Sequence, residues 1–152
     1  MKIIAVDPGK KAGWCVGNPM GESLWTSGVC SGDDPDECSR TAHEHFITNV
    51  HNPSDTHVLI EDQYFMPRGL KGAKTLIRRG AIWWVLARAQ LGVPEKQIHW
   101  ISPSSWQAFF RVNGDKEMIR KLACSVTKRS DVEENEADAI CMAYYYAHKG
   151  VE

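Results

Sequence analysis

The sequence lacks the features of a membrane-spanning or secreted protein. None of its 152 residues belongs to an uninterrupted apolar run of about 18, the length needed to cross a bilayer. No basic segment followed by an apolar one resembles a signal peptide. With 43% hydrophobic and 24% charged residues, the composition is that of an ordinary globular protein. We therefore expect one cytoplasmic domain spanning residues 1–152.

The sequence also has few cysteines and no close Cys-x-x-Cys pair. Its five cysteines are an odd number, in a chain long enough to bury a core without disulfides, so we expect reduced thiols. Four residues within one segment suggest zinc ligands: Cys30, Cys38, His43 and His45. Their spacing is not one of the common structural zinc patterns, so we do not favour this site.

Acidic residues are absent from Gln63 to Pro94, although the net charge of the chain is only −1. Six basic residues occupy that segment: Arg68, Lys71, Lys74, Arg78, Arg79 and Arg88. A second basic group follows: Arg111, Lys116, Arg120, Lys121, Lys128 and Arg129. Such separation of charge favours a polyanionic partner. The simpler alternative is a set of solvated helix faces.

The pattern of apolar residues and turns predicts a mixed α/β fold. Strands are expected over residues 2–7, 13–17, 22–30, 57–61 and 97–102. Helices are expected over residues 33–51 with Asp34 as N-cap, over 71–92, after Ser102-Pro103, and over 114–127 and 134–149. The first three strands follow one another through short turns, which predicts an antiparallel meander. A right-handed crossover then places the fourth strand parallel to the first, in a five-stranded sheet.

Three carboxylates stand where the apolar pattern is strongest. Asp7 ends the first strand, Glu61 ends the fourth, and Asp138 opens an apolar helix. Ionised groups are costly to bury, so acids that meet at one sheet edge favour a hard cation such as Mg²⁺ or Mn²⁺. Taken singly, each acid has an ordinary explanation: a turn cap, an ion pair with Lys10 or Lys11, or a helix N-terminal acid.

Four segments of the sequence resemble, in the same order and at similar spacing, the sequence blocks of RuvC-type Holliday-junction resolvases. The segments are "IIAVDPGKKAGWCV", "VLIEDQYF", "ISPSSWQAFFRVNGDKEMIRKLA" and "NEADAICMAYYYA". The resemblance implies an RNase H-like fold, a homodimer and cleavage of four-way DNA junctions by symmetric nicks. It also implies two-metal-ion catalysis with Mg²⁺, for which Mn²⁺ can substitute.

The resemblance also assigns the metal ligands. The family's acids fall on Asp7, Glu61 and Asp138, with Asp7 between the two ions. A fourth ligand, usually Asp or His, falls on Asn135, whose amide oxygen can bind Mg²⁺ but supplies no charge. Glu134 lies one turn before Asp138 on the same helical face and is the alternative, whereas Glu136 points away.

DNA contacts are implied at further positions. Lys116 resembles the family's lysine and is expected to meet a phosphate together with free N–H groups at the start of its helix; the alternative is a surface lysine. Tyr64 and Phe65 lie where the family places an aromatic residue near the crossover, although core packing is the alternative for one of them. The basic segment adds Arg68, Lys71 and Lys74.

The family's dimer interface includes the helix after the catalytic Glu strand. Here that helix contains Trp83 and Trp84, which cannot both face the same way. One is expected to face the sheet and the other a partner subunit. The alternative is a helix buried on two sides within one subunit.

Other functions compete with that of a resolvase. A related protein could bind branched DNA without cutting, because Asn135 weakens the metal site. A nuclease could act on flaps, forks or RNA–DNA hybrids. An actin-like ATPase or sugar kinase would need two lobes, which 152 residues cannot supply. No feature of the sequence identifies a helicase partner or a preferred cut sequence.

Overall fold

The computed structural model describes residues 1–9, 11–18, 25–31, 35–62 and 70–149. The five strands are β1 (Lys2–Asp7), β2 (Lys11–Gly17), β3 (Thr26–Ser31), β4 (Thr56–Glu61) and β5 (Ile98–Ile101). The five α-helices are α1 (Pro35–Asn49), α2 (Leu70–Val85), α3 (Pro103–Phe110), α4 (Lys116–Thr127) and α5 (Glu134–Lys149). Three short helical turns are η1 (Pro53–Asp55), η2 (Leu86–Gln90) and η3 (Glu95–Gln97).

The strands form one mixed sheet in the order β3-β2-β1-β4-β5. The pairs β1–β2 and β2–β3 are antiparallel, whereas β1–β4 and β4–β5 are parallel. This is the predicted meander of three strands followed by two parallel strands. The crossover through α1 lays β4 beside β1, so both strands end at the same edge of the sheet.

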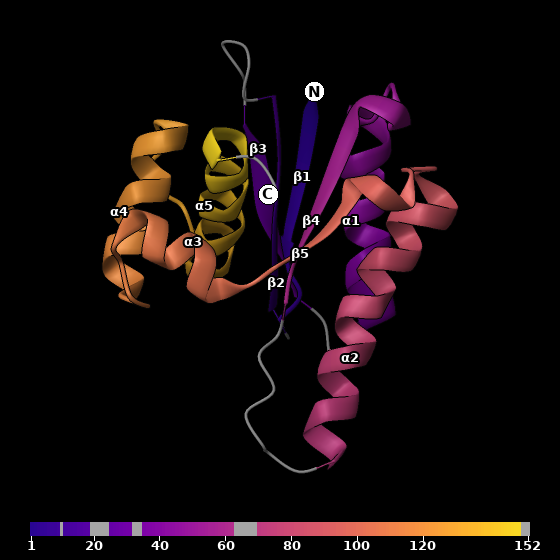
Figure 1. Cartoon of the computed structure of the whole chain (residues 1–152), viewed down its shortest axis with the longest axis horizontal. Coiled ribbons are helices and arrows are strands. Elements are labelled where there is room, and N and C mark those ends of the chain that lie inside the picture. Colours follow the sequence, from indigo (N-terminus) through magenta and orange to yellow (C-terminus); the bar gives the residue numbers. More distant parts are fainter. Residues whose placement is uncertain (10, 19–24, 32–34, 63–69, 150–152) are drawn as a thin grey trace.

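Helices cover both faces of the sheet (Figure 1). On one face, α1 and α2 pack over a core that includes Ile4 and Val6, and on the other face α3, α4 and α5 pack over a core that includes Ile3 and Ala5. Side chains alternate along a strand, so the uninterrupted apolar run of β1 supplies both cores. The apolar run ends at Asp7, which is the last residue of β1.

Most element boundaries lie within two residues of the predicted ones. The expected helix over residues 71–92 continues beyond α2 as the π-helical turn η2, closed by a hydrogen bond of 3.0 Å from the Leu91 N–H to the Leu86 carbonyl. Gly92 then ends the segment with a φ of 69°. The expected N-cap Asp34 and the start of the third predicted strand, residues 22–24, lie outside the described residues. No described helix is both long and apolar enough to cross a membrane.

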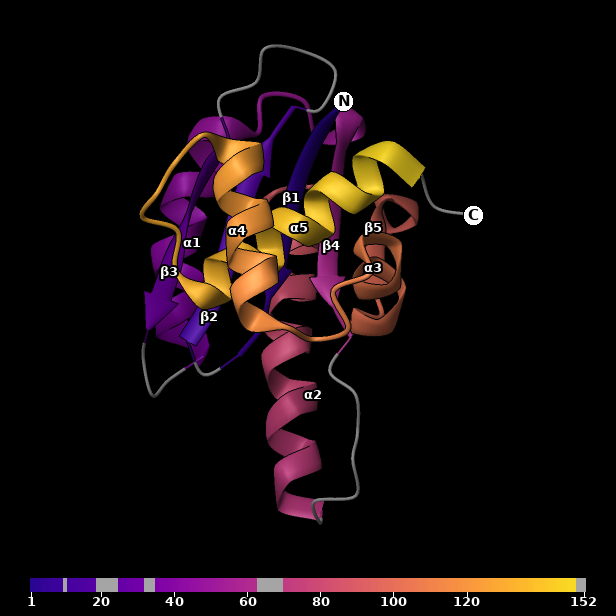
Figure 2. The same ribbon diagram turned by 90° about the vertical axis from the view of Figure 1, so that its left-hand side faces the viewer.

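Helix α2 extends past the end of β4, away from the body of the sheet (Figure 2). Trp83 is buried and packs against Phe46 with ring centroids 6.0 Å apart. Trp84 is half-buried against the same core and keeps part of its surface exposed, so its role at a partner surface stays a prediction. Among the described side chains of α2, the exposed large apolar ones are those of Ile77 and Val85, at 58% and 51% exposure.

Candidate active site

Two carboxylates meet at the edge of the sheet where β1 and β4 end. The parallel register pairs Val6 with Ile60, which brings the next residues, Asp7 and Glu61, side by side. Both side chains follow the alternation that points Ala5 and Leu59 toward the α5 side of the sheet. Glu61 is only 8% exposed. The strand ends thus hold a buried acid next to a second acid.

Helix α5 brings the third acid to this edge. Asp138 lies in the first turns of α5 and is 5% exposed. The helix can approach because β2 has a glycine under it: a Cβ at Gly13 would overlap the backbone of Asn135 and Glu136. Any larger residue at Gly13 would push the start of α5 outward, and Asp138 with it.

The three acids lie within one another's electrostatic reach. Burial, followed by the charges of Asp7 and Asp138, raises the pKa of Glu61 from 4.5 to about 8. A hydrogen bond of 3.1 Å from the Trp106 Nε1–H to Glu61 Oε1 partly opposes this rise in pKa. Burial likewise raises the pKa of Asp138. Without a bound cation, ionisation of all three acids is therefore unfavourable at this site.

Lys116, at the start of α4, supplies part of the missing positive charge. Its Nζ lies 2.7 Å from Asp138 Oδ2 and 3.5 Å from Glu134 Oε1. The N–H groups at the helix start are not free as expected, because Asp115 Oδ1 accepts those of Glu117 and Met118 at 3.1 Å each. That part of the prediction is wrong: Asp115 caps the helix, and it is the Lys116 ammonium that stands close to the acids.

The polar residues in the first turn of α5 contact different parts of the protein. The Asn135 amide donates to the Lys11 carbonyl at 2.7 Å, which ties α5 to β2. Glu136 is buried and pairs with Arg129 at 2.7 Å, so it faces away from the acids as predicted. Glu134 is exposed and shares the Lys116 ammonium with Asp138. Lys11, in turn, forms an ion pair with Glu133, just before α5.

The donor set fits Mg²⁺ or Mn²⁺ chemically. All the candidate ligands are oxygen atoms, which these hard ions prefer. Asp138 Oδ1 is buried and has no hydrogen-bond partner among the described residues, which is the situation that a bound cation relieves. Among those same residues, no three His, Cys, Asp or Glu side chains are arranged to hold a metal ion, so the acids would have to turn toward a cation to bind it.

The cysteine segment shows no zinc site within the described residues. The Cys38 thiol donates to the Cys30 carbonyl at 3.1 Å, and both cysteines are buried. The His45 ring stacks on Trp14 with centroids 4.9 Å apart. These side chains are engaged in packing and in a local hydrogen bond.

The structure describes only some of the remaining DNA-binding candidates. Tyr64, Phe65 and Arg68 lie outside the described residues, as does the side chain of Lys71, while Lys74 is exposed on α2. Sequence reasoning missed the role of Trp106 as the hydrogen-bond partner of Glu61. The available signal was a tryptophan just after β5, the strand that neighbours β4.

Comparison with known proteins identifies the fold. No protein-family model matches the sequence, and no curated protein matches it significantly. Two solved structures of RuvC from Thermus thermophilus are similar. One, in complex with a Holliday junction substrate, has a TM-score of 0.69 at 19% identity and covers 99% of this chain and 97% of its own. The other has a TM-score of 0.67 at 17% identity and covers 97% and 93%. The chain therefore has the RuvC fold, an RNase H-like fold, as its sequence blocks predict.

Proposed function

We propose that this protein is a metal-dependent endonuclease that resolves four-way DNA junctions by paired, symmetric nicks. The observation that carries the proposal is the buried Glu61 carboxylate, flanked by the charges of Asp7 and Asp138 at the strand ends of a RuvC fold. Acids gathered at a buried position favour divalent cations over any role in stability. A RuvC of the same fold is known in complex with a Holliday junction.

Asp7, Glu61 and Asp138 are the residues that would hold the cations. When bound, the ions supply a deprotonated water and neutralise charge on the phosphate that is cut. Trp106 orients the Glu61 carboxylate through its indole N–H. Lys116 is close enough to the acids to contact a phosphate placed there, once Asp138 turns to a cation.

Contacts of the first turn of α5 support Glu134 over Asn135 as the additional ligand. The Asn135 amide is committed to the Lys11 carbonyl, which gives it a structural task. Glu134 already lies beside the ammonium that neutralises Asp138, and it brings the charge that an amide lacks. Glu134→Gln should therefore weaken Mn²⁺ binding more than Asn135→Ala does, measured by calorimetric titration on folded variants.

A DNA path along α2 accounts for the charge separation in the sequence. The helix projects from the sheet edge at which the acids gather, and its exposed Lys74 and Arg78 are cationic. Four further candidates for DNA contact come from the sequence alone and lie outside the described residues or side chains: Tyr64, Phe65, Arg68 and Lys71. Phosphate contacts of this kind weaken as salt opposes the release of condensed counterions, so binding should decline steeply with ionic strength.

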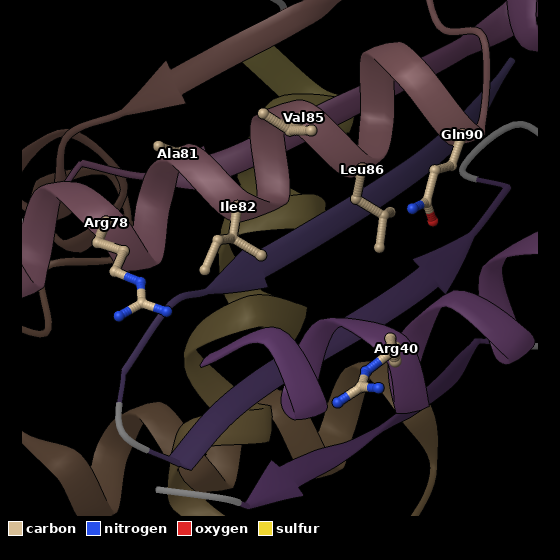
Figure 3. Close-up of a pocket in the computed structure, with 7 residues that line it drawn as sticks. All are labelled: Arg40, Arg78, Ala81, Ile82, Val85, Leu86 and Gln90. Atoms are coloured by element: carbon tan, nitrogen blue, oxygen red, sulfur yellow. The ribbon is translucent and has the colours of Figure 1, made fainter. Parts of the chain in front are cut away.

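A second copy of the chain is the proposed partner of α2. Ile77, Ala81 and Val85 recur every four residues and are exposed, which leaves an apolar stripe along one side of the helix. Figure 3 shows the adjoining groove, where Ile82 and Leu86 point toward α1 and its Arg40. A two-fold dimer would present two active sites to a junction with its own approximate two-fold symmetry.

The dimer has a direct test in solution. Val85→Asp should turn the dimer into a monomer in sedimentation equilibrium, because a buried charge at the interface is unfavourable. Ile47→Asp, at an equally exposed position on α1, is the matched control and should leave the dimer intact. A wild-type chain that is monomeric at all concentrations would refute this part of the proposal.

Cleavage of an end-labelled, immobile four-way junction tests the main proposal. We expect paired nicks with Mg²⁺, none with a chelator, and none in a linear duplex, a flap or an RNA–DNA hybrid. Asp7→Asn should bind the junction but not cut it, whereas Glu95→Gln, an exposed acid on η3, should cut normally. Cutting of the hybrid alone would discard the junction.

Binding without cutting is the second candidate function. It is favoured by two observations: Lys116 occupies one oxygen of Asp138, and Asn135 replaces a charged ligand. Tight junction binding with no nicks in either Mg²⁺ or Mn²⁺ would establish it. Nicking that survives in Asp7→Asn would remove Asp7 from the proposed catalytic residues, and it would also reject binding without cutting.

A further inference from the structure

Two histidines and a tyrosine meet at the end of β4 opposite to the acids. His57 lies near the start of β4, His99 lies on β5, and Tyr146 comes from α5, which crosses in front of β4 in Figure 2. His57 Nδ1 and His99 Nε2 are 3.2 Å apart. The Tyr146 hydroxyl lies 2.6 Å from the first nitrogen and 3.1 Å from the second. Three ligand atoms from three separate elements thus form a closed triangle.

Hydrogen bonds can hold this triangle together in one protonation pattern. A ring nitrogen of a neutral imidazole either donates or accepts, but does not do both. If one of the two nitrogens carries a hydrogen, it and the tyrosine hydroxyl supply two hydrogens for three contacts, so the third contact has no hydrogen of its own. If both nitrogens or neither carries one, the contact between His57 and His99 is a repulsion.

A metal ion would satisfy all three edges together. The circle through the three atoms has a radius of about 1.7 Å, less than the 2.0–2.1 Å of a zinc–nitrogen bond, so one ion can reach all three. A tetrahedral ion at that bond length holds its ligand atoms about 3.3 Å apart, close to the 3.2 Å between the two nitrogens. The Tyr146 oxygen, at 2.6 and 3.1 Å from them, would have to move outward on binding. The imidazole planes differ by only 10°, with centroids 5.4 Å apart.

The protonation and the exposure of these side chains bear on whether they can bind an ion. Burial lowers the pKa of both His57 and His99, so both rings are neutral at neutral pH and each offers one nitrogen without a hydrogen. Burial raises the pKa of the Tyr146 hydroxyl, so an ion that binds its oxygen would have to displace that proton. Tyr146 is buried, whereas both histidines retain partial exposure. An ion can therefore enter from solvent and keep a water molecule as its fourth ligand.

We propose that His57, His99 and Tyr146 form a site for a late first-row divalent metal ion, of which Zn²⁺ is the probe of choice. Imidazole nitrogens favour Zn²⁺, Cu²⁺ and Ni²⁺ over Mg²⁺, so the site differs in chemistry from the carboxylates. It also differs in place: His57 and Glu61 are four residues apart on β4, about 13 Å. The ion would fasten the four-residue edge strand β5 to β4 and α5.

Zinc titration of the chelator-stripped, full-length chain in excess Mg²⁺ tests the site, because Mg²⁺ occupies the carboxylates first. We expect one Zn²⁺ per chain by calorimetry, and at least tenfold weaker binding in Tyr146→Phe and in His99→Gln. His51→Gln removes an exposed histidine outside the triangle and is the matched control. Cys38→Ser should also leave the affinity unchanged, which excludes the thiols.

A second readout separates binding from folding. Electron paramagnetic resonance of the Cu²⁺-loaded chain should show two coupled ring nitrogens, reduced to one in His99→Gln. Circular dichroism and urea unfolding will show that Tyr146→Phe is folded, since it removes one oxygen and keeps the ring. Equal Zn²⁺ affinity in wild type, Tyr146→Phe and His99→Gln would overturn the proposal. So would zinc binding that is lost only in Glu61→Gln, because the ion would then lie at the carboxylates.

Discussion

Replacing Glu61 by glutamine should stabilise the metal-free protein at neutral and mildly alkaline pH. The pKa of Glu61 rises from 4.5 to about 8 on folding, so the folded state holds a proton that the unfolded chain releases. A group of this kind favours folding most below pH 4.5, and its contribution declines as the pH rises to about 8. Each pH unit in that window lowers the free energy of unfolding by about 1.4 kcal/mol, so the whole loss is on the order of a few kcal/mol.

Glutamine has nearly the same shape and cannot ionise, so the variant should not suffer this loss. Urea unfolding at pH 5, 6, 7 and 8, with a chelator present, should show the gap between variant and wild type widening with pH. Added Mg²⁺ should narrow the gap by stabilising the wild type alone. Glu95→Gln, an exposed control, should follow the wild type throughout. If Glu61→Gln is no more stable than wild type at pH 8, with the same pH dependence, the acids do not strain the fold.

Three further changes probe the contacts around the site. Gly13→Ala should lower the free energy of unfolding by about 1–3 kcal/mol and abolish cleavage, because the added Cβ overlaps the Asn135 backbone. Normal cleavage would show that the position of α5 does not depend on this contact. Arg129→Met should lower the free energy of unfolding by about 3–5 kcal/mol, because the buried Glu136 carboxylate loses its cationic partner. Adding Glu136→Gln should recover most of this loss in urea unfolding. No recovery would assign the loss to the packing of Arg129. Lys116→Ala should weaken junction binding in a gel shift. It should also reduce the slope of the logarithm of the binding constant against the logarithm of the salt concentration by about 0.9. An unchanged slope would remove Lys116 from the DNA surface.

The sheet and its acids could be predicted because each depends on local pattern. An apolar run that ends in a carboxylate marks a buried strand with a charged end, and this holds for Asp7 and Glu61 alike. Short turns then force the meander, and the handedness of crossovers places β4 beside β1. Asp138 follows from the apolar helix that it opens. The approach of the three acids is a consequence of topology, which sequence pattern does encode.

Contacts between elements were harder to predict, because they depend on how helices cross the sheet. Lys116 was expected to face a phosphate alongside free N–H groups, yet Asp115 caps those groups and the ammonium meets Asp138. Trp84 was a candidate for a partner surface, and it also packs in part against the core of its own chain. His57 and Tyr146 are 89 residues apart, and no periodicity relates them. Such pairs are set by the packing of whole layers.

The ion pair between Lys116 and Asp138 changes how the protein can respond to its supply of metal. A dissolved cation must be captured from solution, whereas this ammonium is tethered to the same chain as the carboxylate and is present at any dilution. The chain can therefore fold and persist while divalent ions are scarce. If the acids bind a cation as proposed, loading the site would exchange one positive charge for another and would set the displaced ammonium free where a phosphate would arrive. The same residue would then serve first as a placeholder and afterwards as a grip on DNA.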